Sequence, residues 1–185
     1  PDQIHAVPEK KFLLTIVLPK SLINIGKSIF YGCKKLSSVV MGENVASIGA
    51  KAFNSCTALT EVNLKNVGIL GEYAFYGCTS LEKIFLGTSL KVIGKNAFKI
   101  CQELEEIVIP ESVEEICERA FEGCLKLKKV VIKSEKTKID IKKTRKSRFI
   151  VLSPYFDKIY IAFSDSDIPC GIEAAGIIKK YEPHA

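Results

Sequence analysis

One pattern of residue types recurs along the chain at an almost constant interval. It is clearest in three columns, a phenylalanine, a cysteine and a leucine, which each occur five times with successive intervals of 23, 22, 23 and 23 residues. The columns are Phe30, Phe53, Phe75, Phe98 and Phe121; Cys33, Cys56, Cys78, Cys101 and Cys124; and Leu36, Leu59, Leu81, Leu104 and Leu127. Self-similarity at this period is the signature of a repeat protein whose units stack on one another.

Each repeat opens with a strand-like LxxIxL segment and turns back through a short Ala-Phe segment. This order predicts an α/β fold, a right-handed leucine-rich-repeat solenoid with a curved parallel sheet on one face and short helical segments on the other. Because side chains alternate along a strand, residues two apart are predicted to point inward together. The predicted inward pairs are Ile16 and Leu18, Val39 and Met41, Val62 and Leu64, Ile84 and Leu86, and Ile107 and Ile109.

Two segments, LPKSLINIGKSIFYGCKKL (18–36) and IPESVEEICERAFEGCLKL (109–127), carry the repeat in full. They resemble the consensus of the BspA-like leucine-rich repeats, also called Treponema pallidum-type repeats, roughly LxxIxIPxSVxxIGxxAFxxCxxL. The resemblance covers Leu13 to about Ile132. It implies a non-enzymatic protein-binding module of a secreted or cell-surface protein, with adhesion to host matrix or cell-surface proteins as its role.

The five cysteines in one column are predicted to be a ladder of buried free thiols. Stacked repeats place equivalent residues about 4.8 Å apart with parallel side chains, whereas a disulfide needs Cβ atoms about 3.8 Å apart. A second column reads Gly26, Gly49, Gly71 and Gly94 and is then broken by Cys117. Since a cysteine would be strained at positive φ, we expect glycine here because neighbouring backbones approach closely.

The chain divides into four predicted regions: 1–11, an N-terminal remnant or preceding partial repeat; 12–132, the leucine-rich repeats; 133–148, a basic insertion loop; and 149–185, a C-terminal capping segment. The third region holds eight basic and two acidic residues, so it accounts for the net charge of +6, and the rest of the chain is balanced. In the fourth, 149–152 and 158–163 are predicted strands that extend the sheet, and 171–181 a short helix.

The sequence gives little support for a catalytic or metal-binding site. The two histidines, His5 and His184, lie near the ends, and no phosphate-binding glycine motif or zinc-ligand spacing occurs. We therefore expect no enzyme activity, no cofactor, no metal and no nucleic-acid partner. No apolar run reaches 18 residues, so no membrane span is predicted. The chain opens on Pro1, so we expect any signal or anchor to lie outside it.

The candidate partner site is the column between the two inward residues of each strand, because it must point out from the sheet. It reads Val17, Val40, Asn63, Phe85, Val108 and Val131, and we call it the outward strip. A continuous apolar strip on a free surface marks a partner site or a covered surface. Alternatively, β-branched residues are there because they favour strands. The neighbouring column, Thr15, Ser38, Glu61, Lys83, Glu106 and Lys129, is polar and mixed in charge, like an interface rim.

Three functions remain open from the sequence. The first is protein binding through the outward strip, with Phe85 as the anchor. The second is a structural role, in which the strip or the first repeat self-associates or packs on a neighbouring domain. The third is binding of an anionic ligand such as a sulfated glycan through the basic loop, by Lys142, Lys143, Arg145, Lys146 and Arg148.

Overall fold

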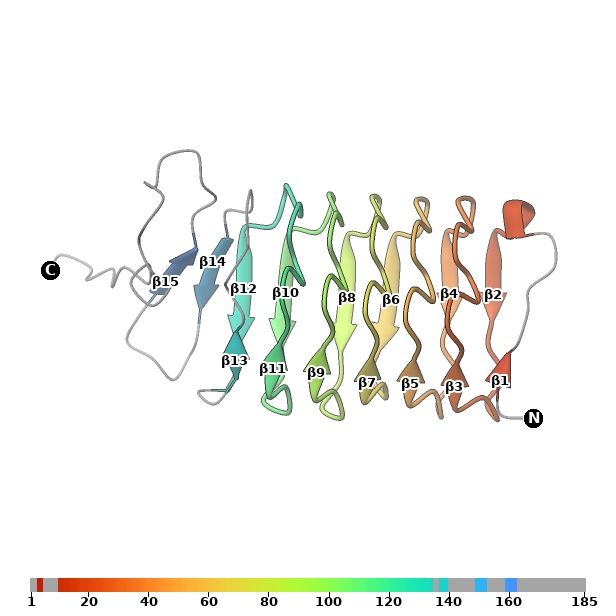
Figure 1. Ribbon diagram of the computed structural model, residues 1–185, viewed down its shortest axis with the longest axis horizontal. Helices are drawn as coiled ribbons and strands as arrows, with labels where there is room; N and C mark the ends of the chain where they lie inside the picture. Colours follow the sequence, from red (N-terminus) through yellow and green to blue (C-terminus); the bar gives the residue numbers. More distant parts are fainter. Residues whose placement is uncertain (1–2, 5–9, 135–136, 140–148, 153–158, 163–185) are drawn as a thin grey trace, which may run out of the picture.

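The computed structural model describes residues 3–4, 10–134, 137–139, 149–152 and 159–162. In these residues the chain is a parallel β-solenoid, and its turns stack in chain order along the long axis (Figure 1). Successive turns add strands to two faces. One face is a row of longer strands that pair in three hydrogen-bonded groups, here called the first sheet, and the other is a continuous second sheet of two-residue strands. The fold therefore has sheet on two sides of each turn, where the sequence predicted sheet on one side.

The first sheet contains the strands that the sequence predicted. They are β2 (Thr15–Val17), β4 (Ser38–Val40), β6 (Glu61–Leu64), β8 (Lys83–Leu86), β10 (Glu106–Ile109) and β12 (Lys129–Ile132). Hydrogen-bonded ladders join β2 to β4, β6 to β8 and β10 to β12, all parallel. Figure 1 shows these ladders continuing in one row.

The second sheet was not predicted. Its strands are β1 (Gln3–Ile4), β3 (Asn24–Ile25), β5 (Ser47–Ile48), β7 (Ile69–Leu70), β9 (Val92–Ile93), β11 (Glu115–Ile116) and β13 (Lys138–Ile139), paired in that order. A strand of two residues is too short to show an alternating pattern. Stacking of equivalent residues, rather than local preference, makes these segments strands.

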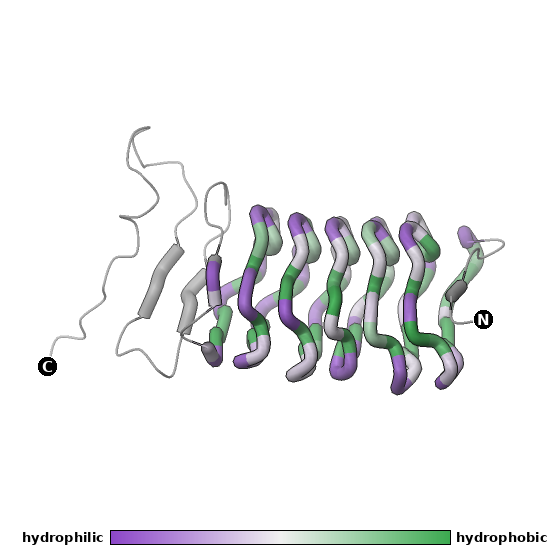
Figure 2. The backbone as a smooth tube through the Cα atoms, turned by 60° about the horizontal axis from the view of Figure 1, so that its bottom comes forward, coloured by the Kyte–Doolittle hydropathy of each residue, from purple (hydrophilic) through white to green (hydrophobic). Residues whose placement is uncertain are grey.

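The interior is a set of apolar columns, as predicted. Most of the predicted inward residues on the side of the first sheet are buried, namely Leu18, Val39, Val62, Leu64, Ile84, Ile107 and Ile109, whereas Ile16, Met41 and Leu86 are partly buried. On the second sheet Ile25, Ile48, Leu70, Ile93 and Ile116 are buried. Figure 2 shows hydrophobic and hydrophilic stretches alternating within each turn. The phenylalanine rings stack through the core at centroid distances of 4.9, 5.1, 5.6 and 5.6 Å. Because each buried ring stabilises the fold by roughly 2 to 3 kcal/mol, this stack is a major source of stability.

The predicted helical segments on the other face are wrong for the described residues. There the Ala-Phe segments are turns, and the one helix is the 3-10 helix η1 (Lys10–Phe12). Two residues of each segment, at positions −2 and +2 from the phenylalanine, have positive φ and so interrupt any helix. They are Ser28, Lys51, Tyr73, Asn96 and Arg119 on one side, and Gly32, Ser55, Gly77, Ile100 and Gly123 on the other.

Hydrogen bonds between turns stabilise these segments instead. Phe30 N donates to the carbonyl oxygen of Ala52, and Phe53 N to that of Ala74, both at 2.8 Å. The same link joins Phe75 to Ala97 and Phe98 to Ala120. A backbone that bonds to the next turn cannot also form the i to i−4 bonds of a helix.

The glycine column behaves as predicted. A Cβ on Gly49 would lie 2.8 Å from the nitrogen of Lys27, and one on Gly71 would lie 2.6 Å from the nitrogen of Ala50. Neither glycine has positive φ. Close approach of adjacent turns is therefore the reason for glycine at this position.

Beyond Ile132 the repeat continues into the segment that was predicted to be a loop. Lys138 and Ile139 form β13, in register with Glu115 and Ile116 of β11. This part of the 133–148 prediction is corrected to a strand, and residues 140–148 lie outside the described residues.

Two strands follow in the predicted capping region. β14 (Phe149–Leu152) pairs in parallel with β12, and β15 (Ile159–Ala162) pairs antiparallel with β14. They coincide with the strands predicted there and extend the first sheet. The helix predicted for 171–181 lies outside the described residues, and the capping role stays a prediction.

Candidate functional site: the outward strip

The outward strip lies on the exposed side of the first sheet. Val17 is 69% exposed, Val40 51%, Phe85 50% and Val108 39%. Asn63 is exposed, and Val131 is half-buried on β12, which pairs on both sides. The structure therefore brings the six predicted residues into one column that faces out of the solenoid.

Parallel register makes members of the strip direct neighbours across the strands. Val17 is opposite Val40, Asn63 is opposite Phe85, and Val108 is opposite Val131. Asn63 interrupts the apolar column, and its side-chain oxygen accepts a hydrogen bond from the backbone N–H of Lys65 at 3.0 Å. The apolar part of the strip is thus divided into an N-terminal pair of valines and a C-terminal group around Phe85.

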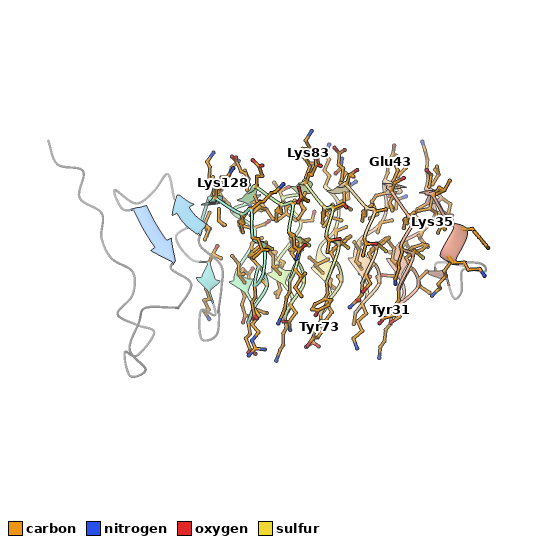
Figure 3. All side chains as sticks on the ribbon, turned by 90° about the horizontal axis from the view of Figure 1, so that it is seen from above. Tyr31, Lys35, Glu43, Tyr73, Lys83 and Lys128 are labelled. Atoms are coloured by element: carbon orange, nitrogen blue, oxygen red, sulfur yellow. The ribbon has the colours of Figure 1, made fainter. Side chains whose placement is uncertain are left out.

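The polar column beside the strip alternates in charge along its C-terminal half. Glu61 is opposite Lys83 across β6 and β8, and Glu106 is opposite Lys129 across β10 and β12. The Lys129 ammonium lies 3.0 Å from a Glu106 carboxylate oxygen. Figure 3 shows Lys83 and Lys128 pointing out on the same side of the solenoid. The charges beside the strip therefore neutralise one another rather than forming a field of one sign.

The same arrangement recurs elsewhere between the last turns. Lys91, Lys95 and Lys99 pair with Glu114, Glu118 and Glu122, each 23 residues later. Lys126 and Lys128 pair with Glu103 and Glu105. The hydrogen bond and the charge of Glu118 raise the pKa of Lys95, and those of Glu103 raise the pKa of Lys126.

The charge balance of the chain outside residues 133–148 conceals a division that sequence reasoning missed. Residues 10–60 contain seven lysines and one glutamate, a net charge of +6. Residues 61–132 contain nine basic and eleven acidic residues, a net charge of −2. The first turns are therefore basic, and the later turns are nearly neutral.

Exposed apolar residues also occur outside the strip. Ile69 (66% exposed) and Val92 (36%) are opposite one another on β7 and β9 of the second sheet. Phe12 (58%) and Leu14 (60%) lie at the first described turn. No pattern marked the second-sheet pair beforehand, because that sheet was not predicted. The exposure of Phe12 and Leu14 could have been predicted from the repeat register, because their equivalents in the next turn, Lys35 and Ser37, are polar.

The cysteine column forms an internal ladder. The thiols of Cys56, Cys78, Cys101 and Cys124 each donate to the carbonyl oxygen of the phenylalanine 25 or 26 residues earlier, at 3.1 to 3.3 Å. Burial raises the pKa of Cys78 to about 12, and it also raises the pKa values of Cys33, Cys56 and Cys101. None of the six cysteines in the described residues forms a disulfide. The column therefore packs in the core, and the raised pKa values make the thiols of Cys33, Cys56, Cys78 and Cys101 poor nucleophiles at neutral pH.

Some residues singled out in the sequence lie outside the described residues. They are the candidate anion-binding residues Lys142, Lys143, Arg145, Lys146 and Arg148, and the histidines His5 and His184. Within the described ranges, no group of three or more His, Cys, Asp or Glu side chains is placed to hold a metal ion. No helix in those ranges is long and apolar enough to cross a membrane.

Solved structures include similar solenoids. A T. pallidum leucine-rich repeat protein (TpLRR) is 27% identical with a TM-score of 0.66, covering 74% of this chain and 66% of that one. A leucine-rich cell surface protein from Faecalibacterium prausnitzii is 25% identical (TM-score 0.52; 71% and 46% covered). The pneumococcal vaccine antigen PcpA is 25% identical (TM-score 0.60; 71% and 34% covered). The chain thus spans less than two thirds of each of these proteins. No curated protein matches it significantly.

The family comparison agrees with the repeat register. Residues 23–147 match the BspA type leucine-rich repeat region in six copies. This range extends beyond the five copies of the phenylalanine column and includes β13. With its turns, its columns and this match in agreement, the chain belongs to the BspA-type leucine-rich repeat family.

Proposed function

We propose that this chain is a non-enzymatic protein-binding module whose first sheet contacts a partner protein through the outward strip. The observation that carries the proposal is the exposure of Val17, Val40, Phe85 and Val108 in one column of a regular sheet. Covering a half-exposed valine or phenylalanine contributes on the order of 1 kcal/mol. Several such side chains in one column would together support a stable contact.

Phe85 is the proposed anchor of this contact. It is the largest side chain of the strip and is half exposed. Aromatic residues near the centre of an interface contribute most to binding when neighbouring contacts exclude water. The alternating charges of the adjacent column would orient the partner, because they can pair only with a complementary sequence of charges.

The family supports the proposed partner class and location. Leucine-rich repeat proteins generally bind proteins, and a similar solved structure is described as a cell surface protein. We infer that this chain acts in a secreted or cell-surface protein and adheres to host matrix or cell-surface proteins. Its contribution is shape and apolar complementarity rather than chemistry on a substrate.

The test is binding of the purified chain to a panel of immobilised extracellular matrix proteins, with three variants in parallel. Phe85→Asp and Val40→Asp place a charge in the strip. Ile69→Asp is the matched control, because Ile69 is apolar and more exposed than either strip residue but lies on the second sheet. Loss of binding with the two strip variants alone, the fold intact by circular dichroism, is the expected result.

Two results would contradict this proposal. Equal loss in all three variants would show that the strip is not the contact. An absence of binding to the whole panel, combined with sedimentation that depends on protein concentration, would favour the structural role in which the strip pairs with a second copy. In that case Phe85→Asp should make the chain monomeric.

A further inference from the structure

A second exposed surface lies at the first two described turns. Phe12 and Leu14 are 58% and 60% exposed. The ammonium groups of Lys11 and Lys35 lie 4.9 and 5.8 Å from the centroid of the Phe12 ring, and Lys34 is exposed beside them in sequence. We call Lys11, Phe12, Leu14, Lys34 and Lys35 the corner patch. Figure 1 shows η1 at the corner of the solenoid, and Figure 3 places Lys35 next to it.

The apolar residues of the corner patch are exposed on the side of the solenoid and not on the end where a further turn would stack. Leu14 is in register with Ser37, whose backbone N–H donates to the Leu14 carbonyl oxygen at 2.9 Å, and Phe12 is equivalent to Lys35. Ser37 and Lys35 are exposed positions on the outer surface of the next turn. Another turn stacked on β2 would cover the inward columns of Leu13 and Ile16, which are partly buried here. Phe12 and Leu14 therefore occupy positions that stacking leaves exposed.

Within the described ranges, the lysines of the corner patch have no acidic partner. Among the described residues, no carboxylate pairs with Lys11, Lys34 or Lys35, and the one glutamate between residues 10 and 60 pairs with Lys20 at 3.8 Å. The equivalent segment near the C-terminal end of the repeats offers a comparison. Leu125 is 68% exposed there, but the lysines that follow it, Lys126 and Lys128, pair with glutamates of the preceding turn. Of these two segments, only the corner patch combines exposed apolar side chains with uncompensated positive charge.

We propose that the corner patch binds the surface of an anionic lipid bilayer. Lysines near such a surface are attracted to acidic headgroups, and each strengthens binding roughly fivefold. Phe12 and Leu14 enter the boundary between headgroups and acyl chains. The lysine side chains beside the ring are long enough to keep their ammonium groups among the headgroups while the ring enters.

The combination of side chains favours a bilayer over other anionic partners. A sulfated polysaccharide offers negative charge but no apolar phase for Leu14. A bilayer offers both an acidic surface and an apolar interior, so it matches every member of the corner patch. The corner patch shares no residue with the outward strip, and the inference does not depend on the strip binding a protein.

The experiment is co-sedimentation of the purified chain with vesicles of phosphatidylcholine alone or mixed with phosphatidylserine. We expect binding to the mixed vesicles, weakened by salt, and little binding to the neutral ones. Lys34→Glu with Lys35→Glu should lower partitioning at least tenfold, and Phe12→Ser with Leu14→Ser should lower it by a similar factor. All four side chains are exposed, and thermal unfolding verifies that the variants fold.

Matched controls carry changes of the same kind elsewhere. Leu125→Ser removes an equally exposed leucine, and Lys27→Glu with Lys65→Glu makes the same change in net charge away from the corner patch. Both should sediment like the unchanged chain. Equal loss in these controls would overturn the proposal, because it would reduce the effect to net charge or general apolarity. Binding to heparin without binding to mixed vesicles would also overturn it and would favour a polysaccharide.

Discussion

The Lys129 ammonium and the Glu106 carboxylate lie 3.0 Å apart, directly opposite one another on adjacent strands and 23 residues apart in sequence. The relationship follows from the repeat itself, because parallel stacking puts every residue beside its equivalents in the adjacent turns. A column of like charges would then repel at each step. The column Glu61, Lys83, Glu106 and Lys129 avoids this by alternating in sign.

The first prediction concerns this column. Glu106→Lys places three lysines in succession and should lower the free energy of unfolding by about 0.5 to 1 kcal/mol, a small effect because the pair is exposed. Urea denaturation at low and high salt measures it, and the difference should shrink with salt. Exchanging the pair, with Glu106→Lys and Lys129→Glu together, restores opposite charges across β10 and β12 and should recover part of the loss. An effect independent of salt would contradict the electrostatic explanation.

The second prediction concerns the phenylalanine stack. Phe75 is fully buried, with neighbouring rings at 5.1 and 5.6 Å. Phe75→Ala should lower the free energy of unfolding by about 3 to 5 kcal/mol, because the cavity lies between two turns and weakens both contacts. Phe85→Ala is the control, since the same deletion at a half-exposed position should lower it by about 1 kcal/mol or less. Similar losses in the two variants would show that the stack is not a main source of stability.

The third prediction concerns the dependence of stability on pH. Folding raises the pKa of Cys78 to about 12 from its ordinary value of 9.0, because burial disfavours the thiolate. Between these values the unfolded chain releases a proton that the folded chain keeps, so stability falls as the pH rises from 9 toward 12. Cys78→Ala removes one such thiol and should make the decline shallower by up to about 1.4 kcal/mol per pH unit.

Urea denaturation of the two proteins between neutral and alkaline pH measures this difference. The comparison cancels the titration of lysines and tyrosines, which the two proteins share. Parallel curves would show that the Cys78 thiol ionises equally in the folded and unfolded states.

The fourth prediction separates two reasons for glycine within one turn. Gly71→Ala would bring a Cβ to 2.6 Å from the backbone nitrogen of Ala50, so the adjacent turns must move apart. We expect a loss of about 2 to 3 kcal/mol. Gly77 has φ of +70° and nothing closer than 3.7 Å to its Cβ position. Gly77→Ala should therefore lower stability by only about 1 kcal/mol, and Gly77→Asn by less.

Thermal and urea unfolding of the three glycine variants rank these effects. An equal loss for Gly71→Ala and Gly77→Ala would mean that positive φ and close approach are not separable causes at these positions. A loss for Gly77→Asn as large as that for Gly71→Ala would contradict the conformational explanation for Gly77.

The sequence alone determined the period, the inward columns, the first-sheet strands and the position of the outward strip. These follow from two local rules, that equivalent residues stack at a fixed repeat and that side chains alternate along a strand. Phe53 and Cys56 could be placed in the core, and Val40 and Phe85 on the surface, by counting residues. The reason for glycine at Gly49 was also accessible, because Cys117 stands in the same column.

Only the tertiary structure decided how each turn is completed. The pattern around Phe53 is compatible with a short helix, but Lys51 and Ser55 adopt positive φ and Phe53 bonds to the next turn instead. The second sheet and the pairing of Lys99 with Glu122 arise in the same way. In each case the deciding interaction joins residues on adjacent turns, far apart in the sequence. Its energy exists only once the turns have stacked, so local preference could not reveal it.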